Sequence, residues 1–171
     1  MTATLSFDQT ELREAFGAFP SGVVAVGGMV DGVPIGLAAS SFQSVSLEPA
    51  LVSFSVANTS STWPVLRRAE RLGLSVLASH HDEVCRQLAG PADERFTDLP
   101  VHVGEQGALL LDDAVATFEC SIEREVEAGD HTWVLLALHS VDDLGGDALV
   151  FHRSAFPRLA RARLSGREGD R

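Results

Sequence analysis

From Ser21 onward the sequence is a series of short strand-like runs separated by turn residues, and this pattern limits the fold more than any other feature. The first three runs are SGVVAVGGMV, VPIGLAASSFQSVSL and ALVSFSVA, separated by Asp31-Gly32 and by Pro49. RLGLSVLAS, ALLLDDAVATFECSIEREVEA, HTWVLLALHSVDDL and ALVFHRSAF continue the pattern. Strands and helices do not alternate regularly, so the sequence predicts a mainly β fold: an antiparallel barrel with short flanking helices.

Three short helices are expected beside the strands. Ser6 and Gln9 have the spacing of a capping box, and apolar residues follow at helical intervals until Pro20. A second short helix is expected after Asn58–Thr62, with Pro64 in its first turn. The third is expected over residues 82–89.

The length of 171 residues is that of a single domain. We expect one domain over residues 1–171, with its core at about 7–159 and a polar tail at about 164–171. Residues 90–107 form a long polar stretch, which we interpret as a loop that is functional or mobile.

The charged residues exclude several classes of function. The net charge of −11 argues against binding to nucleic acid or to an anionic membrane surface. All 13 basic residues are arginine, so lysine Schiff bases and Walker-type phosphate loops are excluded, and the absence of tyrosine excludes a phenolic acid or base.

The cellular location is predicted to be cytoplasmic. No run approaches the ~18 apolar residues of a membrane span, and the first residues lack the pattern of a secretion signal. Cys85 and Cys120 are far apart and match no metal or redox spacing, so we expect two reduced, partly buried thiols.

Common catalytic motifs are absent from the sequence. It has no G-x-G-x-x-G after a strand, no G-x-S-x-G, no H-E-x-x-H and no cysteine cluster. Ser40 or Ser41 could act as an acyl nucleophile with His131 as base, but neither serine lies in a nucleophile elbow.

The consecutive residues His80, His81 and Asp82 allow two interpretations. They could form half of a metal site, but adjacent residues point apart on a strand and these stand where a helix begins. We therefore favour a helix N-cap with solvated imidazoles, and we expect no metal. The remaining histidines are interpreted as structural: His102, His139 and His152.

Two polar segments could converge on an anion. The first is the hydroxyl- and amide-rich stretch Ala38-Ala39-Ser40-Ser41, and the second is Asn58–Thr62 at the start of a helix, where free N–H groups favour a phosphate. Serine-rich strands are also found at sheet edges, where they oppose aggregation. Arg95 could add one charge-assisted contact, although an isolated arginine in a loop is usually solvated.

The stretch AGDHTW places an Asp-His pair at a β-turn before a strongly apolar strand. Gly129 and Asp130 are ordinary turn residues, and His131 could simply be the first residue of the strand. The residues alone leave a functional role for His131 open.

Several of these motifs together resemble the flavin reductase-like family, whose members have a split-barrel flavin-binding fold. The segments that carry the resemblance are FPSGVVAVGG, GLAASSFQSVSLEPALVSFSV, SSTWPVL, DERF and AGDHTW, and they extend over about residues 7–159. Members of this family act as reductase components of two-component flavin-dependent monooxygenases. The resemblance implies binding of FMN or FAD, NADH or NADPH as hydride donor, a homodimer, and an oxygenase component that receives reduced flavin.

The resemblance also implies roles for individual residues. His131 would position the nicotinamide, and Ala38, Ala39, Ser40 and Ser41 would lie against the flavin ring and ribityl chain. The ribityl phosphate would be held by Ser55, Val56, Ala57, Asn58, Ser60, Ser61 and Thr62, and the site would be completed by Leu88, Ala89 and Arg95.

Two departures from the family pattern concern the predicted flavin site. Many relatives have threonine at the position of Ala38 or Ala39, so one hydrogen bond to flavin, about 0.5 to 1.5 kcal/mol, is expected to be missing. Relatives often have a tyrosine near the C-terminus, where this chain offers Phe156, which can stack but cannot donate a hydrogen bond.

The function predicted from these features is an NAD(P)H-dependent flavin reductase. Hydride transfer needs positioning rather than an acid or base, which agrees with the lack of a catalytic triad. The alternatives are a flavin carrier or sensor module without nicotinamide turnover, and a structural or adaptor barrel that binds no flavin.

Overall fold

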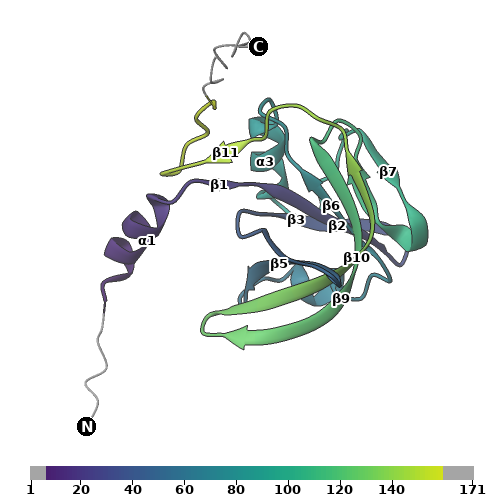
Figure 1. The fold of residues 1–171 in the computed structure, drawn as a ribbon, viewed down its shortest axis with the longest axis horizontal. Helices are drawn as coiled ribbons and strands as arrows, with labels where there is room; N and C mark the ends of the chain where they lie inside the picture. Colours follow the sequence, from purple (N-terminus) through teal and green to yellow (C-terminus); the bar gives the residue numbers. More distant parts are fainter. Residues whose placement is uncertain (1–6, 160–171) are drawn as a thin grey trace, which may run out of the picture.

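The computed structural model describes residues 7–159, which form mainly antiparallel strands with three short α-helices beside them (Figure 1). The prediction of a mainly β, antiparallel fold is confirmed. None of the helices in this part of the chain is long and apolar enough to cross a membrane. In chain order the elements are α1 (Gln9–Gly17), β1 (Ser21–Gly22), β2 (Val24–Val30), β3 (Val33–Ala39), β4 (Gln43–Leu47), β5 (Ala50–Ala57), α2 (Trp63–Leu66), β6 (Leu72–Val76), α3 (Asp82–Leu88), β7 (Val101–Val103), η1 (Glu105–Gly107), β8 (Leu109–Leu111), β9 (Ala116–Ala128), β10 (His131–Asp143) and β11 (Val150–Phe151).

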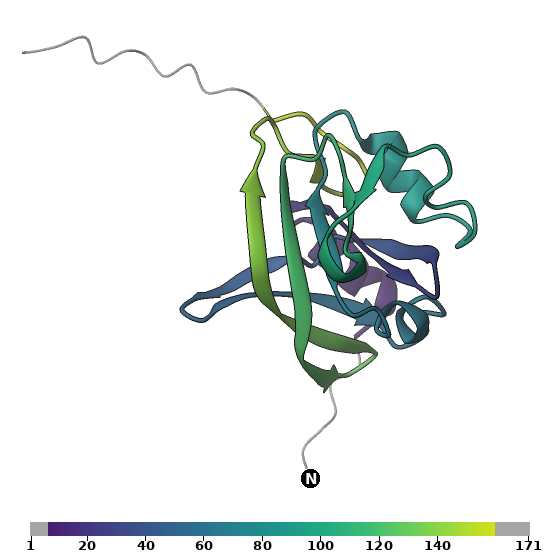
Figure 2. The ribbon, with the colours of Figure 1, turned by 90° about the vertical axis from the view of Figure 1, so that its right-hand side faces the viewer.

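Within residues 7–159, seven strands make one antiparallel sheet in the order β3-β2-β6-β9-β10-β5-β4. β9 and β10 form a long hairpin, and Figure 2 shows its two strands running along the height of the molecule. β5 pairs with β10 from Ala57 opposite His131 to Leu51 opposite Ala137. The end of β5 therefore lies beside the turn of the hairpin.

The interior is filled by apolar side chains from strands that are not all neighbours in the sheet. Val26 of β2, Phe54 of β5 and Leu136 of β10 are completely buried in one cluster. The ring of Phe54 meets Trp63 of α2 edge to face, with centroids 5.5 Å apart. The sheet must curve for these strands to share one core.

The first helix is capped by a residue that the sequence analysis did not select. Asp8 Oδ1 accepts hydrogen bonds from the backbone N–H groups of Thr10 (2.8 Å) and Glu11 (3.1 Å), which hold the pKa of Asp8 below its usual range. Ser6 of the predicted capping box lies outside the described residues. α1 buries none of its residues, Phe16 is 70% exposed, and Figure 1 shows the helix apart from the sheet.

Residues 90–107 are more ordered than a simple polar loop. β7 lies within them and pairs with β8, with Val101 opposite Leu111. The Gln87 amide donates hydrogen bonds to the backbone carbonyls of Glu94 and Thr97. The prediction of one long loop was therefore wrong at its C-terminal end, because a three-residue strand is too short to show a clear period of two. The predicted C-terminal tail at about 164–171 lies outside the described residues.

Candidate functional site

A pocket of about 230 Å³ lies beside the end of β3, between α3 and the segment that follows β11. Three of the predicted site residues line it, namely Ala38, Ser40 and Ala89. The other lining residues come from β1–β2, α3 and the C-terminal segment: Val23, Cys85, Arg86, Phe151 and Phe156. The pocket thus joins residues from both ends of the chain.

The alternation of a β-strand divides the predicted Ala38–Ser41 segment between two environments. Ala38 and Ser40 line the pocket, whereas Ala39 is 7% exposed and packs in the core. The Ser41 hydroxyl accepts a hydrogen bond from Ser55 N (2.9 Å) and donates one to Ser55 O (3.0 Å). Ser41 and Ser55 therefore connect the end of β3 to β5, while Ser40 keeps its hydroxyl at the pocket.

Aromatic and apolar groups form the far side of this pocket. The rings of Phe151 and Phe156 are 5.6 Å apart, and the guanidinium carbon of Arg86 lies 5.2 Å from the centre of the Phe156 ring. Burial raises the pKa of the Cys85 thiol, so the thiol stays protonated and is a poor nucleophile. The pocket therefore offers the Phe156 ring and the apolar Ala38 side chain to a ligand.

The sequence resemblance implies a flavin at this pocket. On that basis, replacing Ala38 with threonine is expected to tighten flavin binding by about two- to twelve-fold, which corresponds to one added hydrogen bond of about 0.5 to 1.5 kcal/mol. Threonine suits a strand, and its hydroxyl would face the pocket. Titration of the protein with FMN and FAD measures the change. Ala39→Thr is the matched control: it would place the hydroxyl in the core, lower the free energy of unfolding and leave flavin affinity unimproved. Equal tightening by both variants would contradict this assignment of the two alanines.

The segment from Asn58 to Thr62 uses most of its side-chain groups within the protein. Ser60 Oγ accepts from the backbone N–H of Trp63 (3.2 Å), and Thr62 is the buried N-cap residue of α2. Ser61 is exposed, and Ala57 pairs with His131. α2 has only four residues, so its dipole contributes little attraction for an anion.

Arg95 joins three separate parts of the chain. Its Nη1 donates to the backbone carbonyl of Gly36 (2.8 Å) and to the Thr62 hydroxyl (2.9 Å), and its Nε donates to Gly90 O (2.9 Å). Arg95 thus connects β3, the start of α2 and the end of the α3 segment. The interpretation of Arg95 as an ordinary solvated arginine is wrong, because three protein oxygens surround it.

Two other predicted residues have buried side chains that do not line the pocket. Val56 is 5% exposed and belongs to the main core cluster, and Leu88 of α3 is completely buried in the second cluster, which also contains the pocket residues Val23 and Cys85. Their side chains contribute to the core that supports the site.

His131 stands at the turn of the β9–β10 hairpin, next to α1. Its Nδ1 lies 2.7 Å from Asp130 Oδ1, and the hydrogen bond and charge of His131 hold the pKa of Asp130 below its usual range. Asp130 is therefore ionised at neutral pH and accepts a hydrogen bond from Nδ1–H of His131. In the neutral form of this ring, Nε2 is then free to accept a hydrogen bond. Among the described residues, no hydrogen bond joins His131 to Ser40 or Ser41, so an acyl-transfer dyad finds no support.

Two further openings lie between α1 and the sheet, one lined by Ser40 of the pocket described above and the other by His131. One of about 350 Å³ is lined by Ser40 and Phe151 together with Arg13 and Phe16 of α1. The other, of about 460 Å³, is lined by Arg13, Phe16 and His131. The first of these openings shares Ser40 and Phe151 with the pocket beside β3, and the two openings share Arg13 and Phe16. The sequence analysis missed Arg13 and Phe16, since no local motif marks them.

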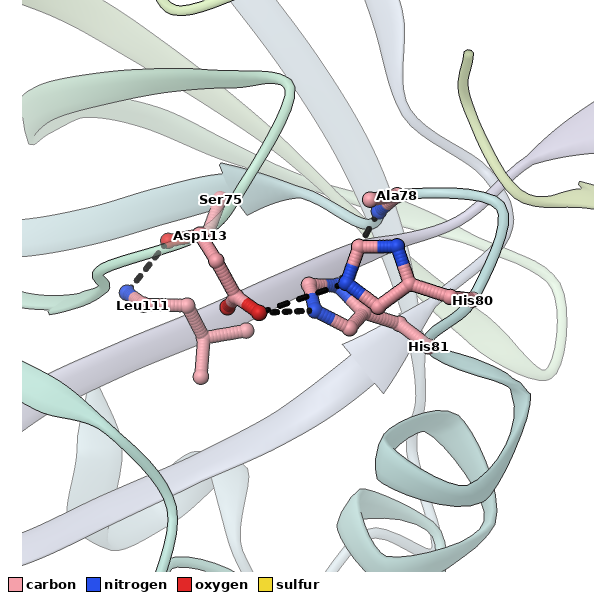
Figure 3. A network of polar contacts seen from close by, with 6 residues as sticks. All are labelled: Ser75, Ala78, His80, His81, Leu111 and Asp113. Carbon is pink, nitrogen blue, oxygen red and sulfur yellow. Dashed lines mark hydrogen bonds and ion pairs between the residues drawn. The ribbon is translucent and has the colours of Figure 1, made fainter. Parts of the chain in front are cut away.

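The three groups His80, His81 and Asp113 meet near the start of α3 (Figure 3). His81 Nε2 lies 3.0 Å and His80 Nε2 3.3 Å from Asp113 Oδ2. Although partial burial favours a higher pKa for Asp113, its hydrogen bonds with His81 and His80 hold that pKa below its usual range. The expectation of solvated imidazoles is therefore wrong for His81, which is 3% exposed. The pairing residue is Asp113 and not Asp82, which binds Arg86 instead.

The backbone fixes the proton on His81. The N–H of Ala78 donates to His81 Nδ1 (3.0 Å), so the neutral ring carries its proton on Nε2 and donates it to Asp113. A histidine that binds a metal through Nε2 would instead have to donate from Nδ1. The arrangement is that of a structural hydrogen bond between the α3 start and the segment before β9.

The fold is thus an antiparallel β sheet with a small pocket beside Ala38 and Ser40 and an Asp-paired histidine at the turn of the β9–β10 hairpin. The chain matches the flavin reductase like domain over residues 16–160, and it therefore belongs to the flavin reductase-like family.

Known proteins agree with this assignment. The chain is 36% identical over 168 residues to a probable flavin reductase of Rhizobium meliloti. This alignment covers 96% of the chain and 54% of the relative. It is 37% identical over 147 residues to the reductase component of a flavin-dependent trigonelline monooxygenase of Acinetobacter baylyi. This alignment covers 85% of the chain and 47% of the relative. The chain thus spans about half the length of these relatives. An NADH:FAD oxidoreductase of Streptomyces globisporus, solved with NAD and FAD fragments, superposes with a TM-score of 0.86 at 33% identity over 94% of this chain and 99% of that one.

Proposed function

We propose that the chain is an NAD(P)H:flavin oxidoreductase, in which FMN or FAD binds at the Ala38 and Ser40 pocket and NADH or NADPH binds toward His131. The observation that carries this proposal is a series of three openings with shared lining residues: Ser40 and Phe151 line the first two, and Arg13 and Phe16 line the last two, the third of which also contains His131. The family membership and the names of the relatives support it.

The residues around the pocket fit a flavin. Ala38, Ala89 and Phe156 offer apolar contacts for a planar ring, and the Ser40 hydroxyl and the Arg86 guanidinium offer polar contacts for its carbonyl groups or its chain. Bound flavin supplies the redox chemistry, because its N5 atom accepts a hydride from C4 of a nicotinamide.

The protein contributes binding and orientation to this reaction. His131 Nε2 can accept a hydrogen bond from the amide group of the nicotinamide, while Asp130 holds the imidazole through Nδ1. Phe16 and Phe151 line the opening between the two proposed ligand positions and offer apolar contacts there. Hydride transfer requires the reacting atoms to be about 3 to 3.5 Å apart, so the orientation of the two ligands affects the rate.

The proposal is tested by mixing the purified protein with NADH or NADPH and excess FMN or FAD and following nicotinamide absorbance. Consumption of at least one nicotinamide with at least one flavin is expected. Flavin binding without consumption of either nicotinamide would indicate a carrier or sensor module. Failure to retain any flavin in equilibrium dialysis would indicate an adaptor domain.

Replacing His131 with alanine is expected to raise the KM for the preferred nicotinamide about ten-fold, because one hydrogen bond to a positioned ligand is worth about 1.4 kcal/mol. The dissociation constant of flavin should stay within about two-fold of the wild-type value, since His131 lies outside the serine pocket. Steady-state kinetics and flavin titration measure the two quantities. An unchanged nicotinamide KM and kcat would show that His131 has no role in binding the donor.

We propose that the functional unit is a homodimer that delivers reduced flavin to an oxygenase component. Phe16 and Phe19 of the α1 segment are 70% and 79% exposed, and a partner surface packed over this segment would bury both rings. The relative from Acinetobacter baylyi is a reductase component, which supports an oxygenase partner. Sedimentation equilibrium should give twice the mass of the chain, and a monomer would contradict the proposed dimer.

We further propose that the sheet closes as a split barrel and that residues 1–171 form one domain. The hydrogen bonds between Ser41 and Ser55, and a core shared by β2, β5, β6 and β10, support closure of the sheet. A cytoplasmic location is proposed because both cysteines, Cys85 and Cys120, are free and buried. Burial raises the pKa of Cys120 to about 12, so that thiol is inert.

A further inference from the structure

We propose that Asn58 is a positioning residue for His131, and that it acts on nicotinamide binding rather than as a flavin ligand. This inference rests on the proposed function of His131 as the group that places the nicotinamide. It assigns to Asn58 a role different from the ribityl or phosphate contact that the family resemblance implies.

Asn58 makes three hydrogen bonds to the hairpin turn that carries His131. Its Nδ2 donates to Gly129 O (3.1 Å), and its Oδ1 accepts from the Thr132 hydroxyl (2.9 Å). Its backbone N–H donates to Asp130 O (2.9 Å). These contacts reach residues on both sides of His131, so they fix the path of the backbone through it.

The orientation of the Asn58 amide follows from its partners. The carbonyl of Gly129 can only accept a hydrogen bond, so it must face the NH₂ group of Asn58. The carbonyl oxygen of Asn58 is then the group left to receive the Thr132 proton. One N–H and one lone pair of the amide are already used inside the protein, which lowers the capacity of Asn58 to hold a separate ligand.

The turn of the hairpin lies just beyond the last paired residues of the sheet. β5 pairs with β10 only as far as His131 and Ala57, and beyond that pair the turn contains Gly129 in a left-handed conformation with φ of 67°. Figure 1 shows the turn at the free end of the β9–β10 hairpin. Asn58, the next residue after β5, is placed to hold this end.

The position of Asp130 also depends on a hydrogen bond from Asn58. Its carboxylate holds His131 Nδ1, and its backbone carbonyl is held by Asn58 N. A change in the turn would therefore move both the imidazole and the carboxylate that fixes its proton. Because a misplacement of about 1 Å can cost about 100-fold in a reaction that depends on orientation, a small movement here is sufficient to affect hydride transfer.

The test uses Asn58→Ala with Thr59→Ala as the matched control, since the Thr59 side chain is exposed and makes no hydrogen bond among the described residues. Asn58→Ala is expected to raise the nicotinamide KM about ten-fold and to leave the flavin dissociation constant within about two-fold. Thr132→Val removes one of the same hydrogen bonds and should raise the nicotinamide KM by a smaller factor. A flavin affinity that falls as much as the nicotinamide KM rises would overturn the proposal in favour of a flavin ligand.

A double variant separates positioning from a general loss of structure. If Asn58 acts through His131, then adding Asn58→Ala to His131→Ala should change the nicotinamide KM by less than about two-fold. A full additional ten-fold increase in the double variant would show that the two residues act independently and would overturn the proposal.

A further measurement does not depend on turnover. In the NMR spectrum of the free protein, Asn58→Ala should change the ring chemical shifts of His131, while Thr59→Ala leaves them unchanged. Unchanged His131 signals in Asn58→Ala would overturn the proposal. Absence of nicotinamide oxidation by the wild-type protein would instead overturn the proposed function, and the NMR result would still decide whether Asn58 positions His131.

Discussion

Replacing Arg95 with alanine is expected to lower the free energy of unfolding by about 3 kcal/mol and to weaken flavin binding at least ten-fold. The guanidinium donates to Gly36 O, Gly90 O and the buried Thr62 hydroxyl, so its removal leaves three oxygens without their donor. The end of the α3 segment would also lose its connection to β3, and Ala89 of the pocket stands in that segment. Chemical denaturation and flavin titration measure the two effects.

Arg95→Lys is the informative control for this prediction. A lysine keeps the positive charge, but its compact ammonium group cannot reach the three oxygens with the fork geometry of a guanidinium. An intermediate loss of stability is therefore expected. If the lysine variant had the stability of the wild type, the positive charge alone would explain the role of Arg95. If the alanine variant had the stability of the wild type, the three hydrogen bonds would contribute nothing to the fold.

Replacing Gly73 with alanine is expected to lower the free energy of unfolding by about 3 kcal/mol, at the upper end of the usual cost of overpacking. A Cβ atom at Gly73 would lie 2.7 Å from the carbonyl carbon of Leu109, and closer still to its oxygen, so β8 could not keep its place against β6. The same contact region includes the hydrogen bond from Leu111 N to the buried Ser75 hydroxyl, at 3.0 Å. Thermal and chemical denaturation measure the loss.

Gly22→Ala is the matched control, because Gly22 is also a strand glycine and nothing lies within 4 Å of the Cβ that it would gain. Its stability should stay within about 0.5 kcal/mol of the wild type. Equal destabilisation by the two variants would show that loss of glycine itself, rather than the contact with β8, is responsible.

The strand pattern made much of the fold predictable. Runs such as ALVSFSVA and HTWVLLALHSVDDL became β5 and β10, because their apolar residues recur with the period of a strand and clear turn residues separate them. Short elements were less visible. β7 has three residues and was interpreted as loop, and the capping role of Asp8 was assigned to Ser6 two residues earlier.

The candidate site was predicted as segments, and the structure divides those segments into single residues. Ser40 and Ser41 are equivalent in the sequence, but Ser40 faces the pocket and Ser41 bonds to the backbone of Ser55. His81 looked solvated, yet it is buried against Asp113, a residue 32 positions away. Such pairs join distant parts of the chain, so no local pattern can reveal them.

The sequence by itself determined the antiparallel β class, the exclusion of lysine and phosphate-loop chemistry, and the family resemblance, because periodicity, composition and motif order are properties of neighbouring residues. Only the tertiary structure decided which side of β3 faces the pocket, and that Arg13 and Phe16 of α1 line the openings that contain Ser40 and His131. It also decided that Arg95 and Asn58 connect separate segments of the candidate site through hydrogen bonds. The physical reason is that these arrangements depend on hydrogen bonds and packing between residues far apart in the chain, and these form only when the strands take their final register.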